Sequence, residues 1–300
     1  MLLLLIALLL VGGGSPHAAQ PKPRPTPRPI PIAEPGALAI DYQGGLAVAD
    51  RRLNRVVRID LRTGARRILV AGLREIDAVT YDDQFRLYVG SANRIYRIDG
   101  RRKVLLAGTA SRAFTGDGGP ATAASLDGLG GFDVDHDETI VLSEYDNRVR
   151  FIGPDGKIST IAGTGEEGYA GDGGPATKAL LKHPHDIATR ADREVVIADS
   201  HNGVLRRVDP AGVITTLAKG FRAPVALQGG AGNSLFVADA GANAIYKLTP
   251  DGSSRRVVGR VTAPAYLAVD ENDTIYVSEL AGARRVLLIP HAGPTRVLVT

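Results

Sequence analysis

Histidine and acidic side chains gather in one short stretch of the chain, His183-Pro184-His185-Asp186, and His201 and Asn202 follow the next apolar run. An imidazole and a carboxylate that converge can hold a divalent metal, or can act as a general base oriented by an acid. His185 is the metal-ligand candidate of this group, with a single zinc or calcium as the ion. A hydrogen-bonded structural histidine is the competing interpretation, so the elements that carry these residues must decide between them.

A second pattern, Gly-Asp-Gly-Gly-Pro-Ala-Thr, occurs once in each of the loops 110–122 and 165–177. Asp117 and Asp172 could ligate calcium, and Tyr169 is a further candidate for ligand contact. One carboxylate per loop is too few for a dedicated calcium site, which takes several oxygen ligands. The structural interpretation is that the glycines permit left-handed turns and that each Asp accepts backbone N–H groups.

One strand pattern returns six times, as an apolar run that ends in Asp, Glu or Ser. The copies end at Asp50, Ser91, Glu144, Asp199, Asp239 and Glu279, with spacings of 41, 53, 55, 40 and 40. A period near 40 is typical of a propeller blade, because one four-stranded sheet cannot bury both faces until neighbours pack around an axis. The sequence therefore predicts an all-β, six-bladed β-propeller of four-stranded antiparallel blades over residues 35–300.

The connections between the expected strands agree with this repeat. Pro154-Asp155-Gly156 and Pro250-Asp251-Gly252 are hairpin signals, since proline presets the first turn residue and glycine accepts a positive φ. The two long spacings correspond to the loops 110–122 and 165–177, which we expect on one face of the ring. The last unit ends with its own fourth strand, so we expect no exchange of strands between the chain ends, although Ile30 and Ile32 could add an edge strand.

The repeat also assigns roles to polar residues. Asp50, Glu144, Asp199, Asp239 and Glu279 recur with Asn54, Asn147, Asn202 and Asn243 a few residues later. Because they recur in most units, we interpret them as loop-capping groups and not as an acidic active site. Alignment of the innermost strands instead places Asp77, Asp133, Gln228 and Tyr266 on the channel wall, with His183 and His185 at its mouth.

The fourth unit carries a family resemblance. The words Ile161-Ala162-Gly163-Thr164-Gly165, Gly171 to Thr177 and Ile197 to Asn202 look like an NHL repeat of the subtype found in bacterial exported proteins and teneurin-like propellers. The resemblance covers roughly residues 35–300 and is strongest between 105 and 218. The resemblance implies a six-bladed propeller. It says little about function, because known relatives include recognition scaffolds, sensor domains, lyases and lactonases.

Pro184-His185-Asp186-Ile187 also resembles one blade of the zinc-dependent peptidyl-amidoglycolate lyases, in which a histidine after proline binds the metal. The resemblance assigns this role to His185 alone. The corresponding positions in the other units are Gly36, Ile76, Gly130, Val225 and Ala265, so the three-histidine set is missing. Glu34-Pro35-Gly36 superficially resembles a motif of gluconolactonase-like proteins, in which a metal-binding Glu lies near Gly-Pro, but the order of the residues differs. No Asn and Asp that would complete such a metal site can be assigned.

Composition excludes several classes of protein. The 300 residues contain 36 Gly, 18 Pro and no Cys, which suits many short strands and rules out disulfides and thiolate metal sites. The net charge of +4 is spread along the chain without interleaved aromatics, so we expect no nucleic-acid partner. The chain has no nucleophile elbow, phosphate loop or His-Glu-x-x-His word.

The amino-terminal region differs in kind from the repeat. Leu2 to Val11 are apolar and too few to span a bilayer, so we expect a signal peptide over 1–19. Proline fills every second position from Pro21 to Pro31, which predicts an extended linker over 20–34. We therefore expect export to the periplasm or cell exterior, association with the cell envelope, no transmembrane span and a monomer.

Three functions follow from these observations as hypotheses. The first is a non-catalytic recognition or scaffold propeller that binds a protein, peptide or glycan on the face carrying the loops 110–122 and 165–177, without a cofactor. The second is a metal-assisted lyase or lactonase centred on His185 at the channel mouth. The third is a passive structural module.

Overall fold

The computed structural model describes residues 30–299, apart from 136, 191–192, 280 and 283. The predicted signal peptide (1–19) and most of the predicted linker (20–29) lie outside the described residues. Among the helices of the described part, none is long and apolar enough to cross a membrane.

The described chain forms twenty-four strands and five short 3₁₀ helices. The strands are β1 Pro35–Ile40, β2 Gly45–Asp50, β3 Arg55–Asp60, β4 Arg66–Ala71, β5 Ile76–Tyr81, β6 Leu87–Ser91, β7 Ile95–Asp99, β8 Arg102–Ala107, β9 Leu129–Val134, β10 Ile140–Glu144, β11 Arg148–Ile152, β12 Ile158–Ala162, β13 Pro184–Thr189, β14 Val195–Asp199, β15 Val204–Val208, β16 Ile214–Lys219, β17 Pro224–Gly229, β18 Leu235–Asp239, β19 Ala244–Leu248, β20 Arg255–Arg260, β21 Pro264–Val269, β22 Ile275–Glu279, β23 Val286–Ile289 and β24 Arg296–Val299. The 3₁₀ helices are η1 Ala121–Ala123, η2 Ala176–Lys178, η3 Ser200–Asn202, η4 Ala231–Asn233 and η5 Ala240–Ala242.

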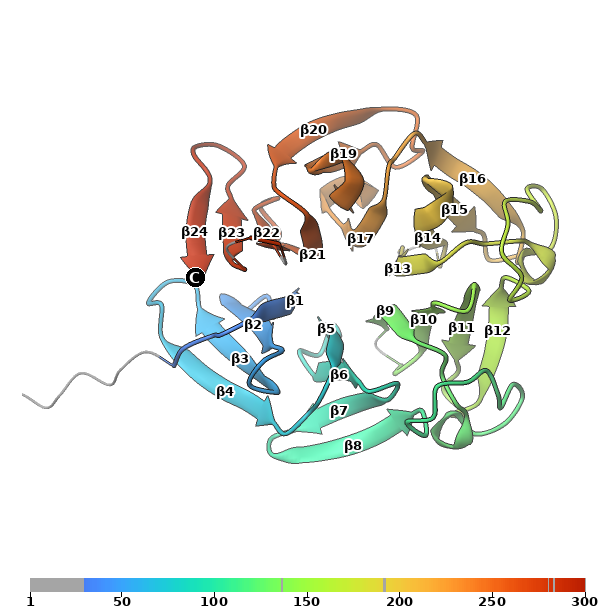
Figure 1. Ribbon diagram of the computed structural model, residues 1–300, viewed down its shortest axis with the longest axis horizontal. Helices are drawn as coiled ribbons and strands as arrows, with labels where there is room; N and C mark the ends of the chain where they lie inside the picture. The colour runs from blue at the N-terminus through green and yellow to red at the C-terminus, as the bar shows by residue number, and fades with distance from the viewer. Residues whose placement is uncertain (1–29, 136, 191–192, 280, 283, 300) are drawn as a thin grey trace, which may run out of the picture.

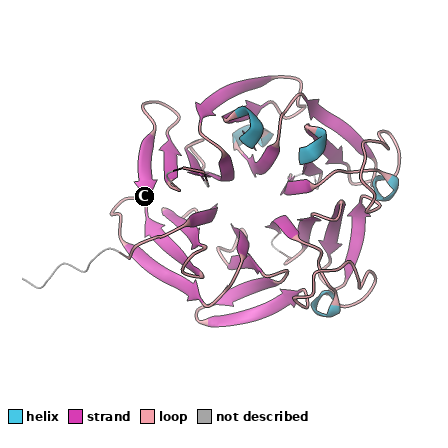
Figure 2. Cartoon of the chain, viewed as in Figure 1, coloured by secondary structure: helices cyan, strands magenta, loops and turns pink. Residues whose placement is uncertain are grey.

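Each successive group of four strands forms one antiparallel sheet in chain order. The six sheets stand around a common axis as the blades of a ring, with β1, β5, β9, β13, β17 and β21 innermost (Figures 1 and 2). The hairpin signals act as expected, since Gly156 and Gly252 adopt φ values of 72° and 70°. The prediction of an all-β, six-bladed propeller is confirmed.

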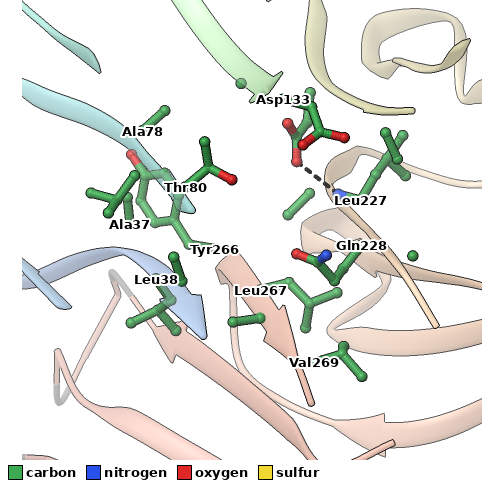
Figure 3. Close-up of a pocket in the computed structure, with 18 of the residues that line it drawn as sticks. Ala37, Leu38, Ala78, Thr80, Asp133, Leu227, Gln228, Tyr266, Leu267 and Val269 are labelled. Carbon is green, nitrogen blue, oxygen red and sulfur yellow. Dashed lines mark hydrogen bonds between the residues drawn. The ribbon is translucent and has the colours of Figure 1, made fainter. Parts of the chain in front are cut away.

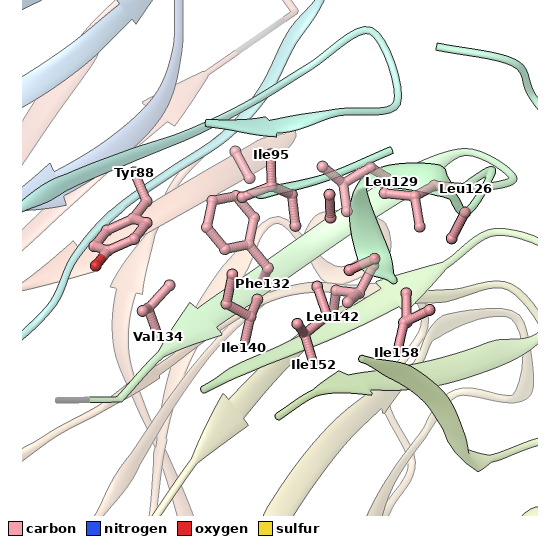
Figure 4. Packing of buried hydrophobic residues seen from close by; sticks show 14 residues of the cluster. Tyr88, Ile95, Leu126, Leu129, Phe132, Val134, Ile140, Leu142, Ile152 and Ile158 are labelled. Carbon is pink, nitrogen blue, oxygen red and sulfur yellow. The ribbon is translucent and has the colours of Figure 1, made fainter. Parts of the chain in front are cut away.

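The hydrophobic core consists of six clusters, one between each pair of neighbouring blades. Figure 4 shows the cluster between the second and third blades, where Tyr88 and Ile95 meet Phe132 and Leu142. The second strand of each blade is buried along its length, as in β2 and β14. Both faces of a blade are therefore covered only when its two neighbours are in place.

The ring closes without exchange of strands, as the sequence predicted. β1 to β4 form the first blade and β21 to β24 the last. Ile32 is not part of a strand, and the expected extra edge strand does not form. Ile32 is instead 3% exposed within the cluster between these two blades, and Ile30 packs against it. An ion pair of 2.9 Å between Arg284 and Glu34 adds a second link between the chain ends.

The Gly-Asp-Gly-Gly-Pro-Ala-Thr segments of the two long loops lie on the outer rim of the ring, against the outermost strands. Gly118 N donates to Ile158 O in β12, and Gly173 N donates to Ile214 O in β16. β12 and β16 are outermost strands, so each segment covers an otherwise open sheet edge. Figure 1 shows both loops at the perimeter, beside β12 and β16.

Two fully buried arginines hold these rim segments in place. Arg206 donates to Ala170 O, Leu180 O and the Asp172 carboxylate, and its guanidinium lies 3.6 Å from Asp199. Arg150 makes the equivalent contacts in the preceding blade, including Asp117 at 2.7 Å. Asp117 and Asp172 thus bind residues of their own blades, as the structural interpretation expects, while both side chains stay partly exposed.

Arg206→Met tests how much this anchor contributes. The substitution leaves Asp199 buried without its cation, so we expect a loss of about 3–5 kcal/mol in the free energy of unfolding. The control is Arg207→Met, on the next position of β15, whose partly exposed side chain pairs with Glu194. The control should lose about 1 kcal/mol or less. Urea unfolding of both variants measures the difference, and equal losses would contradict the anchor.

Candidate functional site

The innermost strands of the six blades surround one cavity of about 530 Å³ on the ring axis, here called the axial cavity. Asp77, Asp133, Gln228 and Tyr266, the four residues taken from the alignment of innermost strands, line it, and so do His185 and Asp186. Figure 3 shows Tyr266, Gln228 and Asp133 projecting into this opening from different strands. The lining runs along the innermost strands, from His185 near the start of β13 to Glu271 beyond the end of β21. The face of the ring where β13 begins is here called the entry face.

The strand register corrects one of the predicted equivalences. Ile76 pairs with Ser91 just as Pro184 pairs with Asp199, so the residue equivalent to His185 in the second blade is Asp77 and not Ile76. Both residues follow directly on the first ladder pair, where the register shifts by one residue. The bulge re-aims the side chain at this position toward the axis, so Asp77 and His185 occupy equivalent places around the mouth.

Two of the lining carboxylates join neighbouring blades. Asp186 of β13 accepts from Leu227 N of β17 at 2.8 Å and from Ile187 N at 2.9 Å. Asp133 of β9 accepts from Thr189 N of β13 at 3.1 Å. Burial raises the pKa of Asp186 to about 7 and also raises that of Asp133. One oxygen of each carboxylate thus accepts from the next innermost strand, and the other accepts from the following residue of its own strand.

Gly131 makes room for one of these carboxylates. A Cβ at this position would lie 1.6 Å from Asp186 Oδ1, so no larger residue fits while Asp186 keeps its bonds. The glycine therefore belongs to the contact between the third and fourth blades.

His185 is half-buried in the wall, and no carboxylate among the described residues bonds to its imidazole. Burial, together with the nearby His183, lowers its pKa to about 4, so the imidazole is neutral at pH 7. Asp186 cannot orient it as a base, because both Asp186 oxygens accept backbone N–H groups. The arrangement expected for acid-oriented general-base catalysis is therefore absent around His185 in the described part of the chain.

Three aromatic rings stack at the mouth on the entry face. Tyr145 and His183 lie 4.5 Å apart, and His183 and His201 lie 4.4 Å apart, all nearly parallel. Tyr145 also touches His185, with ring centroids 5.3 Å apart. Sequence reasoning missed Tyr145. The available signal was that it directly follows the repeated acid of its blade, where the fourth and fifth blades have Ser200 and Ala240.

The repeated acids and asparagines behave as capping groups, which confirms their structural interpretation. Asp239 accepts from Arg222 N and Ala223 N, and Asp199 accepts from Lys182 N. Asn202 donates to Gly168 O and to Asp199, so this candidate is also engaged in loop structure and not in the axial cavity.

Glu144 is the exception among the repeated acids. Its carboxylate is wholly buried, with the Arg150 guanidinium 3.6 Å away, beyond hydrogen-bond distance. Burial raises the pKa of Glu144 to about 8, against the lowering effect of Arg150.

The lining of the axial cavity is acidic. Its ionisable carboxylic acids are Asp77, Asp133, Asp186, Asp270 and Glu271, and none of the described lining residues is Lys or Arg. The chain as a whole carries +4. The ionised carboxylates of such a lining favour a cationic ligand over an anionic one.

The lining does not fit a zinc or calcium cage. No three His, Asp or Glu side chains in the described ranges are placed to hold one ion. Near His185, Asp186 has its oxygens occupied by backbone donors. Metal ligands of this type must be free and convergent, so we derive no step through a metal here.

Glu144→Gln tests the burial of this carboxylate through pH. The folded pKa of about 8 exceeds the ordinary value of 4.5, so the stability linked to this group is fully present below pH 4.5 and is lost as pH rises through 8. We therefore expect the melting temperature of the variant, relative to that of the wild type, to be several degrees higher at about pH 8.5 than at about pH 5. Calorimetry across this range measures it, and parallel curves would contradict the assignment.

No protein-family model and no curated protein matches this chain. Solved structures share its fold. A streptogramin B lyase matches with a TM-score of 0.63 and 14% identity over 90% of this chain and 84% of that one. A gluconolactonase from Xanthomonas campestris matches with a TM-score of 0.64 and 14% identity over 87% and 86%. A third match is a catalytically inactive histidine-to-alanine variant of virginiamycin B lyase from Staphylococcus aureus, solved with quinupristin. Its TM-score is 0.58 and its sequence identity is 18%, over 89% of this chain and 84% of that one. At these identities the similarity establishes the six-bladed propeller fold.

Proposed function

We propose that this protein is an exported recognition propeller of the NHL type that binds a peptide, protein or glycan without a cofactor. The observation that carries the proposal is the axial cavity of about 530 Å³, whose lining includes Tyr145 of the ring stack that Tyr145 forms with His183 and His201. A cavity of this size with a few convergent polar groups is typical of a ligand site.

The bonding of the acids favours recognition over catalysis. Asp133 and Asp186 hold neighbouring blades together, and His185 is neutral without an acid beside it. Catalytic acids and bases need positions from which they can exchange protons with a substrate. The rim loops 110–122 and 165–177 are bound to their own blades, so in this proposal the ligand enters at the axis and not at the loops.

The predicted signal peptide and linker place the propeller outside the cytoplasm in this proposal. The linker residues Lys22, Arg24 and Arg28 would lie along an anionic cell-envelope surface while the ring projects from it as a monomer.

Closure of the mouth by Val225→Trp tests the proposed site. Val225 is the lining residue equivalent to His185 in the fifth blade, and an indole there occupies the opening. An array of peptides and glycans identifies ligands of the wild-type protein. We expect Val225→Trp to bind these ligands at least about tenfold more weakly. Arg207→Gln on the rim is the control, with unchanged binding and a matching melting temperature in both variants. Binding that survives Val225→Trp but is lost when loop 165–177 is shortened would instead assign recognition to the rim.

The second candidate function is a metal-assisted lyase or lactonase at His185. It is favoured by the fold shared with a streptogramin B lyase and a gluconolactonase, and by the position of His185 on the cavity wall. Elemental analysis after dialysis separates the candidates. One zinc or calcium per chain that disappears in His185→Ala would support the enzyme, whereas the recognition propeller requires no stoichiometric metal.

A further inference from the structure

Asp77 stands apart from the other acids of the axial cavity. Asp133 and Asp186 accept backbone N–H groups of the next blade, and Asp270 accepts from Asn272 N and Thr274 N in its own turn. Glu271 is exposed in the turn after β21. Asp77 is partly buried in the wall, and within the described ranges it makes no hydrogen bond or ion pair. A carboxylate that lines a cavity without a bond to the protein is available to a ligand.

Aromatic rings surround this carboxylate at the mouth. Asp77, Tyr145 and Tyr266 all line the axial cavity. Burial raises the pKa of both tyrosines, and the negative charge of Asp77 adds to the increase. Tyr145 is held by its stacking on His183 and by the bond from Tyr145 N to Gly128 O. The faces of Tyr rings attract cations, and more strongly where water is excluded.

The charges that face Asp77 are few. Arg51 and Arg112 lower its pKa and Glu75 raises it, but burial dominates and brings the value to about 6. Arg112 is already paired with Asp127 at 3.1 Å. His185, at the equivalent place in the fourth blade, is neutral above pH 4 and does not neutralise the carboxylate. Asp77 is therefore mostly ionised at neutral pH and has no internal counter-ion in contact.

We propose that the mouth of the axial cavity binds an organic cation, an ammonium or guanidinium group, with the Asp77 carboxylate as its counter-ion and the rings of Tyr145 and Tyr266 beside it. This inference rests on the proposed function and specifies its ligand as a peptide or glycan that carries a basic group. The other lining carboxylates, deeper along the axis, add to the attraction without contacting the cation.

Arg51 is the internal competitor for this site. It lies near enough to lower the pKa of Asp77, yet forms no ion pair with it in the described structure. Removal of its charge by Arg51→Gln should therefore tighten cation binding, whereas a purely structural role of Asp77 predicts no such gain. Because Asp77 must be ionised, binding should also weaken as pH falls through about 6.

The test compares two probes that differ only in charge, Nα-acetyl-argininamide and Nα-acetyl-citrullinamide, titrated against the full chain by NMR. We expect wild type to prefer the arginine probe by about tenfold and Asp77→Asn to prefer it by less than about twofold. Asp83→Asn, in the exposed turn of the same blade, is the matched control and should keep the full preference. Melting curves show that each variant is folded.

Several outcomes would overturn the inference. They are equal binding of the two probes by wild type, no binding of either probe, or a preference that survives Asp77→Asn. A neutral ligand could also bind in a way that Val225→Trp blocks and Asp77→Asn does not change. That result would support the recognition site and contradict the proposal that it binds a cation. If Val225→Trp leaves the binding of every probe and ligand unchanged, the axial cavity is not the binding site, and the proposed function itself is wrong.

Discussion

The packing of one blade against the next is the constraint on which the rest of the molecule depends. Each four-stranded sheet has two apolar faces, and six separate clusters bury them between neighbours. Burial of this kind stabilises only a complete ring, because a missing blade would expose two faces at once. The contact between the first and the last blade is therefore reinforced by residues outside the strands. Ile32 packs in the cluster between these two blades, and Arg284 forms an ion pair with Glu34.

The polar groups of the interior serve the same constraint. Asp133 and Asp186 reach across the axis wall to backbone donors of the next blade, and Arg150 and Arg206 anchor the rim segments over outermost strands. Buried polar atoms are tolerated in such places only when they are bonded. Once these side chains are assigned to the scaffold, few remain at the mouth for ligands, and they are aromatic rings, a neutral histidine and Asp77.

The charge distribution separates the two regions of the ring. The outermost strands carry many of the basic residues, for example Arg66 of β4 and Arg255 of β20, while the axial cavity is lined by acids. Lysine and arginine on edge strands discourage pairing with other chains, and an acidic lumen selects cations. Basic side chains are thus frequent on the outermost strands, whereas the charged groups that line the axis are carboxylates.

The sequence by itself determined the number of blades, the hairpins and the capping acids, because these follow from local patterns repeated at a fixed period. It also identified the wall residues Asp77, Asp133, Gln228 and Tyr266, since strand alternation fixes which side chains face the axis. Only the tertiary structure decided the register that makes Asp77 the equivalent of His185, the rim position of the long loops, and the ring stack on Tyr145. The physical reason is that a bulge, a loop path and a partner from another blade are set by packing between distant segments, and no local pattern encodes them.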